Sequence, residues 1–394
     1  MTMILAIGLF KMNYCKECLT TDLRPNAKFI NGVCIACEYN ASHYRLSAQH
    51  FENRLIYLDK YIKDHIRKFR NKPSHKSYDC IVGVSGGKDS TRQAHWVRDR
   101  LGLKPLLVCV GYPPKQMTHI GAENISNLIR MNFDLEIICP APETSAKLSL
   151  EAFKTFGNVS KASEMALFAN VPKLAIEHNI KLIFWGENPA LQVGDSATLG
   201  ENIFDGNNLR QLNTLTDGGY TWINILADQN KASFYQYPDI NSFNSSGIKI
   251  VYLGPAWNDW SNDENSEYAA LHGLSLRPYD ADKTGDISGA SMLDEEFTNI
   301  NMMLKYFKFG FGRATDTCCE LIRQGKLTRE KSKLIVEKYD GVCSDEIIQR
   351  YCNYVNITER KFWEIANQYI NDTIFIKTNK RPKPKFKVGE NFCE

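Results

Sequence analysis

A short glycine-rich segment at positions 85–90, SGGKDS, has the residue types needed to bind phosphate. The apolar run 78–84 before it predicts a buried strand, and the segment after it predicts a helix capped by Asp89 or Ser90. Glycines allow several backbone N–H groups to converge on one anion, and a helix N-terminus adds partial positive charge. Lys88 adds an ammonium group. An ordinary strand-to-helix turn is the simpler alternative, but the complete string favours a phosphate site.

Four of the twelve cysteines have the spacing of a metal site. Cys15-x-x-Cys18 and Cys34-x-x-Cys37 are separated by fifteen residues, the arrangement of a four-thiolate zinc ribbon. Two disulfides or an iron–sulfur cluster are the alternatives, and disulfides are disfavoured in a reducing compartment. A closed four-cysteine site is usually structural. The other eight cysteines form no CxxC pair. Several of them lie in predicted strands or helices and are expected to be buried apolar side chains rather than nucleophiles.

Strands and helices alternate around the glycine-rich turn. Residues 47–69 carry apolar side chains at helical spacing and predict a linker helix after the ribbon. Further strands are predicted at 106–110, 135–139, 182–185 and 248–253. This alternation predicts an α/β fold with a parallel sheet covered on both faces. Ligands of such sheets bind at the carboxyl ends of the strands. That edge would hold residues 85–90, 111–112 and 186–188.

Beyond the fourth predicted strand the chain changes character. Residues 189–247 are polar and rich in glycine and asparagine, which predicts a long functional loop. The aromatic residues Trp222, Phe234, Tyr235 and Tyr237 favour an ordered loop. From residue 294 onward the pattern is helical. Its predicted N-caps are Thr328, Ser344 and Thr358. The basic tail 377–387 is expected to be a solvated terminus.

Length and composition describe a soluble globular protein with more than one domain. The 394 residues carry a net charge of +3, too small to indicate nucleic-acid binding by itself. The apolar start MTMILAIGLF is too short to span a membrane and lacks the features of a signal peptide, so a cytoplasmic protein is expected. Met12 is a candidate natural start. Three regions are predicted: an N-terminal extension and ribbon (1–45), the sheet domain (46–255) and a mainly helical region (256–394).

The loop closely resembles the PP-loop of the ATP pyrophosphatase superfamily, whose members cleave ATP between its α- and β-phosphates. Other segments resemble the N-acetyl sugar amidotransferase family. They are YCKECL and GVCIACEY at the ribbon, WGENPA at 185–190, NNLRQLNTLTDGG at 207–219, KFGFGRATD at 308–316, and the following LTRE and KYDG. The matching stretch runs from residue 14 to about residue 341. The first eleven residues are not part of the family pattern.

This resemblance implies the fold of an adenine nucleotide α-hydrolase-like (PP-loop) domain and a specific chemistry. These enzymes act in bacterial surface-glycan biosynthesis and convert an acetamido group on a sugar, often nucleotide-linked, into an acetamidino group. The amide oxygen attacks the α-phosphate of ATP, pyrophosphate leaves, and ammonia displaces AMP. Mg²⁺ would neutralise the pyrophosphate. Zinc would be structural.

The resemblance also implies site residues. Lys88, Asp89 and Glu187 are the candidate catalytic residues, and Asp89 either orients the loop or helps to bind the metal. The candidate ATP-binding residues are Val84, Ser85, Gly86, Gly87, Lys88, Asp89, Ser90, Val110 and Gly111. The candidate substrate-binding residues are Glu187, Asn188, Asn207, Arg210, Asn213, Arg313 and Asp316. Glu187 has a structural alternative, bonding to neighbouring loop amides, and Asp316 has one as an ion-pair partner of Arg313.

The source of ammonia has to lie outside this chain. No cysteine has the sequence context of a glutaminase nucleophile. In the resembled family a separate glutaminase and a barrel-type ammonia-channel subunit, similar to imidazole glycerol phosphate synthase, supply ammonia. We therefore expect such subunits as partners, with an N-acetylated nucleotide sugar as substrate and no membrane contact.

Two alternative functions would place this chain in other classes of protein. Some tRNA-thiolating enzymes also combine a zinc ribbon with a PP-loop, but they typically need further active-site cysteines, and this chain has no CxxC beyond the ribbon. The chain also lacks the basic excess expected for tRNA, so nucleic acid is an unlikely partner. A nucleotide-sensing module without catalysis is the second alternative, and the intact loop disfavours it.

Overall fold

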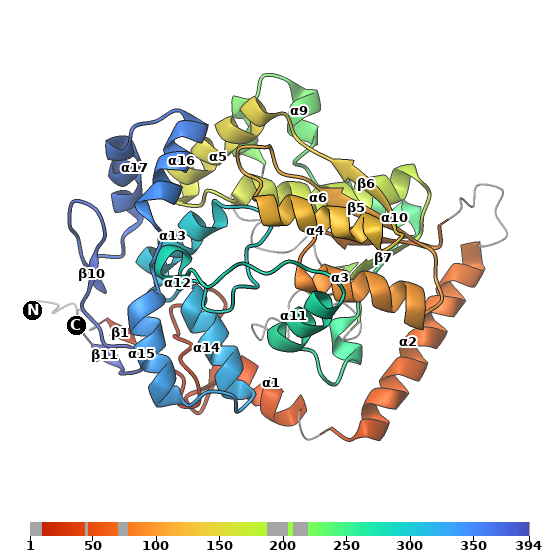
Figure 1. Ribbon diagram of the computed structural model, residues 1–394, viewed down its shortest axis with the longest axis horizontal. Helices are drawn as coiled ribbons and strands as arrows, with labels where there is room; N and C mark the ends of the chain where they lie inside the picture. The colour runs from red at the N-terminus through yellow and green to blue at the C-terminus, as the bar shows by residue number, and fades with distance from the viewer. Residues whose placement is uncertain (1–9, 44–45, 70–77, 187–203, 208–219, 394) are drawn as a thin grey trace, which may run out of the picture.

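A five-stranded parallel β-sheet forms the centre of the protein (Figure 1). The computed structural model describes residues 10–43, 46–69, 78–186, 204–207 and 220–393. The strands are β4 (Cys80–Val84), β5 (Pro105–Val110), β6 (Asp134–Ile138), β7 (Leu182–Trp185) and β8 (Lys249–Tyr252). Each of them lies within two residues of a strand predicted from the sequence, so the α/β fold class is confirmed.

The strand order is β6-β5-β4-β7-β8, and all neighbouring pairs are parallel. The chain moves outward from β4 to β6 and then returns to the other side of β4 for β7 and β8. A crevice opens at such a reversal, beyond the carboxyl ends of the two strands that flank it. The glycine-rich loop follows β4 directly and therefore lies at this reversal.

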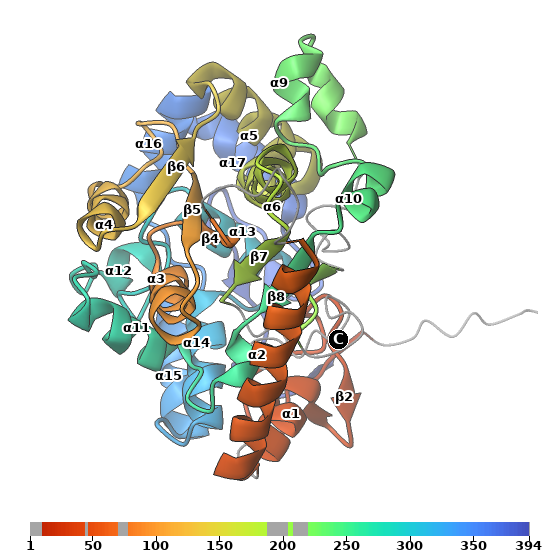
Figure 2. The same ribbon diagram turned by 90° about the vertical axis from the view of Figure 1, so that its right-hand side faces the viewer.

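Helices cover both faces of the sheet (Figure 2). Side chains that alternate along each strand are therefore buried in two separate cores, one on each face. Ile81 and Ile183 pack on the side of α5 (Pro142–Phe156), α6 (Lys161–Glu177) and α10 (Ile240–Ser246). Val82 and Phe184 pack in the other core. That core contains side chains of the predicted linker helix α2 (Ala48–Phe69), of α3 (Lys88–His95) and of α4 (His119–Arg130).

Helix α3 begins earlier than the sequence predicts. Its N-cap is Gly87, in an extended conformation (φ −81°, ψ 173°), and no side chain caps it. The prediction of Asp89 or Ser90 as cap is therefore wrong, since both lie within the first turn. The Ser90 hydroxyl instead donates a hydrogen bond to the carbonyl oxygen of Gly87 at 3.2 Å. The helix continues into a π-helical turn, η1 (Trp96–Arg100).

The described part of the β7–β8 connection is ordered and packed. It contains η3 (Thr221–Ile225) and α9 (Gln229–Ser233) before α10. Tyr235 and Tyr237 are buried in the core next to α6, as the aromatic content of this segment predicts.

The chain after β8 is helical. Its helices are η4 (Gly254–Ala256), α11 (Asn262–Leu271), α12 (Ala281–Thr284), α13 (Thr298–Phe309), α14 (Arg313–Arg323), α15 (Arg329–Tyr339), α16 (Asp345–Val355), α17 (Glu359–Ala366) and η5 (Asn367–Tyr369). The predicted caps Thr328, Ser344 and Thr358 are confirmed, since each hydroxyl accepts a hydrogen bond from the backbone N–H three residues later.

The N-terminal ribbon and the C-terminal helices share one hydrophobic core. The ribbon consists of short strands and helix α1 (Ile35–His43), and its hairpin pairs β2 (Phe29–Ile30) with β3 (Val33–Cys34). Strand β1 (Lys11–Met12) pairs with β11 (Phe392–Cys393), so the two described ends of the chain lie side by side (Figure 1).

The basic tail is not simply a solvated terminus, which corrects the prediction. Strand β10 (Lys383–Pro384) pairs with β9 (Phe375–Ile376), and Phe386 and Val388 are buried. Lys383, Lys385 and Lys387 are exposed, so charge and burial alternate along the segment. The sequence shows the charges of the tail, but it does not show which part of the protein Phe386 and Val388 pack against.

We expect Phe386→Ala to destabilise the protein by about 3–5 kcal/mol, because the ring is buried against Phe375 at a centroid distance of 5.6 Å. The neighbouring change Lys387→Ala removes an exposed side chain and serves as the control. Urea unfolding of the two variants measures the difference. Equal midpoints for Phe386→Ala and the unchanged protein would mean that the tail does not stabilise the fold.

Candidate active site

The loop at the end of β4 has the backbone of an anion site. Gly86 has a positive φ of 80°, and a Cβ atom there would lie 3.1 Å from the backbone nitrogen of Ile125 in α4. Both the conformation and the close approach therefore require glycine. With no side-chain cap on α3, the amides at the start of this helix are available to an anion.

Helix α11 and the segment before it hold the side chains of Asp89 and Arg92. Lys88 Nζ lies 2.9 Å from Oδ2 of Asp89, and Oδ1 of Asp89 accepts a 2.6 Å hydrogen bond from Asn265. Arg92 donates to Oδ1 of Asn265 at 2.7 Å and binds Asp259 at 2.8 Å. The Asp89 carboxylate is thus fixed on two sides, which supports a role in orienting the loop.

A cavity of about 730 Å³ adjoins the loop. Ser85, Lys88 and Asp89 form one part of its wall. Arg313 and Asp316, at the start of α14, form another part, together with Arg24 of the ribbon. The structure therefore brings the predicted substrate residues of the GFGRATD segment to the same cavity as the predicted ATP-binding loop.

Asp316 is the centre of an ion-pair cluster. Its two carboxylate oxygens lie 2.8 Å from Arg24 and 2.6 Å from Lys305. Burial alone would raise the pKa of Asp316, but the charges of Lys305, Arg24 and Arg313 hold it below its ordinary value. The expected ion-pair alternative for Asp316 is therefore present, with Arg24 and Lys305 as the direct partners instead of Arg313.

Asp340, in the KYDG segment, fixes the start of α14. Its carboxylate accepts hydrogen bonds from the backbone N–H of Gly312 (2.8 Å) and Thr315 (3.1 Å) and from the Thr315 hydroxyl. A Cβ atom at position 312 would lie 2.7 Å from Asp340 Oδ1, so Gly312 leaves room for this contact. Burial raises the pKa of Asp340 to about 6. The sequence motif did not reveal this role, because the two segments are distant along the chain.

The site residue Asp294 and its buried neighbour Glu295 were missed in the sequence analysis. Asp294 lines the cavity. Burial raises its pKa, whereas a hydrogen bond with Ser85 and the charge of Lys88 act in the opposite direction. Glu295 is buried, accepts hydrogen bonds from Gln116 (3.2 Å) and the backbone of Phe297 (2.8 Å), and has a pKa raised to about 8 by burial and by Asp294. The available signal was a run of three acidic residues, 294–296, directly after the apolar Met292 and Leu293.

The other predicted residues have different locations. Val84 ends β4, and Val110 and Gly111 at the end of β5 line a small separate cavity that also contains Tyr112 and Tyr235. Asn207 lies beside β8, where its side-chain oxygen accepts a 3.0 Å hydrogen bond from the backbone of Ile250. The remaining predictions, Glu187, Asn188, Arg210 and Asn213, lie outside the described residues.

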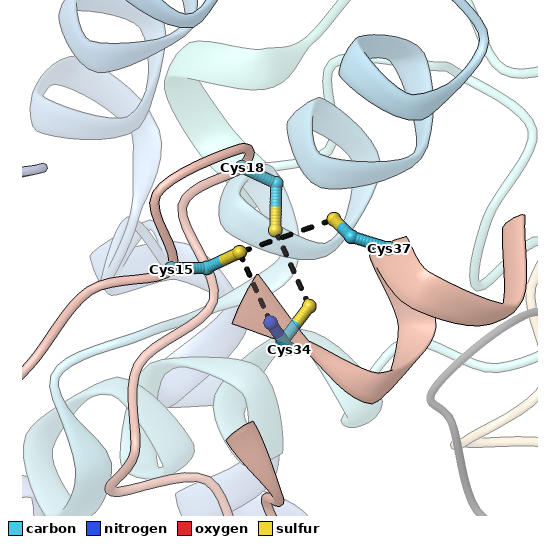
Figure 3. Close-up of side chains that lie close together, drawn as sticks. All are labelled: Cys15, Cys18, Cys34 and Cys37. Atoms are coloured by element: carbon cyan, nitrogen blue, oxygen red, sulfur yellow. Dashed lines mark hydrogen bonds between the residues drawn. The ribbon is translucent and has the colours of Figure 1, made fainter. Parts of the chain in front are cut away.

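The four ribbon cysteines form a compact buried cluster (Figure 3). Their sulfur atoms all lie within 4.8 Å of one another, with 3.7 Å between Cys18 and Cys34 and 4.0 Å between Cys15 and Cys37. Four thiolates at zinc–sulfur distances of about 2.3 Å in a tetrahedron lie about 3.8 Å apart. The cluster therefore fits one zinc ion, and little room remains for the iron and sulfide ions of a larger cluster.

Backbone groups complete the surroundings of this cluster. The N–H of Cys34 donates to the sulfur of Cys15, and the N–H of Thr20 donates to the sulfur of Cys18. Arg329 of α15 donates to the carbonyl oxygens of Cys15 and Cys18 and to that of Gly389 in the tail. Of the other eight cysteines, six are buried, and Cys139 and Cys393 are exposed.

The strand order and the loop define a PP-loop protein of the adenine nucleotide α-hydrolase-like class. Residues 292–391 match the family model described as "LPS biosynthesis protein WbpG-like, C-terminal domain". The match covers about a quarter of the chain. The match includes the GFGRATD and KYDG segments and begins two residues before Asp294. It supports the resemblance to the N-acetyl sugar amidotransferases.

Two of the solved structures that resemble this chain have low TM-scores. One is the U34-tRNA thiolase NcsA from Methanococcus maripaludis with its [4Fe-4S] cluster (15% identity, 68% of this chain, 77% of that chain, TM-score 0.29). The other is NMN synthetase from Francisella tularensis (14% identity, 56% of this chain, 98% of that chain, TM-score 0.25). Similarities this weak support no inference about the site. Comparison with curated proteins found no match. None of the described helices is long and apolar enough to cross a membrane.

Zinc removal is expected to unfold the ribbon and to expose the core that it shares with the C-terminal helices. Cys34→Ser should lose the metal and become poorly soluble, whereas Cys393→Ser changes an exposed cysteine outside the cluster and should keep it. Elemental analysis of the purified proteins measures bound zinc. A full equivalent of zinc in Cys34→Ser would contradict the assigned ligand set.

The raised pKa of Glu295 predicts a pH-dependent stability. Between the ordinary glutamate pKa and about 8, the folded protein keeps a proton that the unfolded chain has released. The free energy of unfolding should therefore fall as pH rises through this window, by up to about 1.4 kcal/mol per pH unit. Glu295→Gln removes this dependence and should gain stability relative to the unchanged protein from pH 5 to pH 8.

Urea unfolding at several pH values measures this effect, and Glu267→Gln, on the exposed side of α11, is the matched control. Parallel pH profiles for Glu295→Gln and Glu267→Gln would show that Glu295 does not hold the proton.

Proposed function

We propose that this protein is an ATP-dependent, AMP-forming amidotransferase (a carbon–nitrogen ligase) that converts the acetamido group of an N-acetyl sugar into an acetamidino group. One observation carries the proposal: a single cavity is lined both by the PP-loop and by the WbpG-like segment. The description of that family supports a place in lipopolysaccharide (O-antigen) or related surface-glycan biosynthesis, and the loop supports the use of ATP.

The chemistry explains why ATP is required. An amide carbonyl is a poor electrophile, and its oxygen is a poor leaving group. Attack of the amide oxygen on the α-phosphate forms a new O–P bond and breaks the bond to pyrophosphate. Ammonia then adds to the activated carbon, AMP leaves with the former amide oxygen, and a proton is released from the nitrogen.

The described residues suit the first half of this reaction. The amides of Gly86 and Gly87 and the side chains of Ser85 and Lys88 would bind the departing pyrophosphate. Asp89, which binds Lys88, and Asp294, on which the charge of Lys88 acts, both line the cavity. They fit a metal held by one or two carboxylates plus phosphate oxygens. Mg²⁺ there would neutralise charge on the phosphates. Glu187 remains a candidate catalytic residue.

Zinc has no role in the reaction steps. The four-cysteine cluster has no open position, which is typical of a structural site. No cysteine of the described residues lines the cavity, whereas sulfur transfer to tRNA needs a thiol near the activated base. This observation favours a sugar amide over a tRNA base as the group that is activated.

Ammonia supply is part of the proposal. The sequence has no glutaminase signature, and we propose that a separate glutaminase and a barrel-type channel subunit deliver ammonia to this protein. The acceptor would be an N-acetylated nucleotide sugar.

The activity test incubates the purified protein with ATP, Mg²⁺, ammonium and a panel of acetamido nucleotide sugars. We expect release of AMP and pyrophosphate, and a sugar in which NH replaces one oxygen, seen by mass spectrometry. Lys88→Ala and Asp89→Ala should lower turnover by about 10²–10³-fold, because each removes a charged group beside the phosphates. Lys63→Ala, on the exposed surface of α2, should have no effect.

The same assay compares nitrogen sources, and ammonium should support turnover while glutamine alone does not. Activity on tRNA with a sulfur donor, and none on sugars, would overturn the proposal. Equal use of glutamine and ammonium would overturn the need for partner subunits.

A further inference from the structure

The cavity wall contains a group of cations that the PP-loop does not use. Arg24 comes from the ribbon, six residues after Cys18, and Arg313 comes from the first turn of α14. Both line the cavity together with Asp316, and Lys305 of α13 contacts Asp316 from a third segment. Arg24, Lys305 and Asp316 are each about one-fifth exposed, so the cluster is largely but not completely buried.

Positive charge exceeds negative charge in this cluster. Asp316 is the carboxylate that both Arg24 and Lys305 bind, and Arg313 is close enough for its charge to act on Asp316. The pKa of Lys305 is lowered by burial and further by the charges of Arg24 and Arg313, although Asp316 opposes this shift. Asp316 alone does not balance these three cations, and the nearby Asp340 carboxylate is bound to the backbone N–H groups of Gly312 and Thr315.

Arg313 has unused hydrogen-bonding capacity. Its Nε atom is buried and has no hydrogen-bond partner among the described residues. A buried donor without an acceptor is costly, and a buried cation without a counter-charge is costlier still. The backbone amides of Gly312 and Thr315 are bound to Asp340, whereas the buried Nε of Arg313 remains a donor without an acceptor.

The acidic residues elsewhere in the wall already have partners of their own. Asp89 binds Lys88, and Asp294 forms a hydrogen bond with Ser85. Asp263 binds Lys326 at 3.2 Å, and Glu320 accepts a 2.6 Å hydrogen bond from the backbone of Asn262. None of these contacts involves the cations around Asp316. The excess positive charge is thus local to the part of the wall formed by the ribbon, α13 and α14.

We propose that Arg24 and Arg313 form a second anion subsite, which binds a phosphate group on the sugar substrate. Guanidinium groups suit this task, because their planar donors bind two phosphate oxygens at once. The PP-loop would bind the pyrophosphate of ATP, and this subsite would bind the phosphoester of the acceptor. The assignment rests on the proposed function and adds the residues that recognise the phosphorylated part of its substrate.

The ribbon positions Arg24 through short-range contacts. The backbone N–H of Arg24 donates to the carbonyl of Thr21 at 3.2 Å, and the backbone carbonyl of Arg24 accepts from Ala27 at 2.9 Å. The guanidinium lies over the ring of Phe311, 4.9 Å from its centroid, and is bound by Asp316. The ribbon therefore contributes a side chain to the cavity in addition to stabilising the fold.

Binding measurements on the full-length, zinc-loaded protein test this subsite. Isothermal titration uses three probes: uridine diphosphate N-acetylglucosamine, N-acetylglucosamine 1-phosphate and unphosphorylated N-acetylglucosamine. We expect the two phosphorylated probes to bind more tightly than the third, and the tighter of the two identifies the source of the phosphate. Arg24→Gln and Arg313→Gln should each weaken the phosphorylated probes by about 10-fold or more, the value of one charge-assisted hydrogen bond.

Matched measurements separate this effect from unfolding and from loss of the PP-loop. The affinity for ATP with Mg²⁺ should change less than about twofold in both variants, whereas Lys88→Ala should weaken ATP and spare the sugar probes. Arg360→Gln, on α17 with a side chain that is 90% exposed, is the charge control. Zinc content and the thermal midpoint verify folding. If the Arg24→Gln variant loses zinc, the binding measurements use the Arg24→Lys and Arg313→Gln variants instead.

Unchanged binding of both phosphorylated probes in the arginine variants would overturn the subsite. Equal affinity for the unphosphorylated sugar, or no binding of any phosphorylated probe to the unchanged protein, would also overturn it. These outcomes differ from a failure of the proposed function, because that failure appears as an absence of AMP formation in the activity assay, whichever probes bind.

Discussion

The Asp316 carboxylate joins three segments that are far apart in the sequence. It binds Arg24 of the ribbon and Lys305 of α13, while belonging itself to α14. A largely buried carboxylate is stable only when cations and donors surround it, so the three segments hold one another in place. Through this contact the ribbon, which begins the chain, becomes part of a cavity wall formed mainly by residues after position 260.

The metal cluster and the C-terminal tail reinforce the same arrangement. Arg329 binds the carbonyl oxygens of two zinc-ligand cysteines and also that of Gly389. Strand β1 pairs with β11, and the buried side chains of the ribbon and the C-terminal helices form one core. The ribbon is therefore an integral part of the C-terminal region. A metal ion held by the four cysteines would therefore affect the proposed anion subsite, because the same ribbon carries Arg24.

The site combines two sources of positive charge with different physical origins. At the loop, charge comes from uncapped amides at the start of α3 and from Lys88. At α14, the amides of Gly312 and Thr315 are bound to Asp340, and the charge comes from guanidinium groups. Backbone amides form a fixed cradle, whereas arginine side chains adapt to the position of a ligand. This difference suits the proposed reaction, in which ATP is the common co-substrate and the sugar acceptor can vary.

Local signals in the sequence were sufficient for the sheet, the loop and the four cysteines. An apolar run before SGGKDS predicts β4, because a strand buried on both faces needs a continuous apolar sequence. The CxxC pairs predict the metal ligands, because their spacing alone sets the geometry. The caps Thr328, Ser344 and Thr358 were also predictable, since a cap depends on contacts within one turn. The cap of α3 was not, because the loop geometry moved the helix start to Lys88.

The sequence by itself determined the chemistry that the PP-loop supports and the ligands of the zinc cluster. Only the tertiary structure decided which residues share the cavity with that loop. Asp294, Asp340 and Arg24 have no local pattern that marks them, and each acquires its role from a partner at least 25 residues away along the chain. Charges that lie far apart in the sequence interact strongly only after burial has brought them together and excluded water.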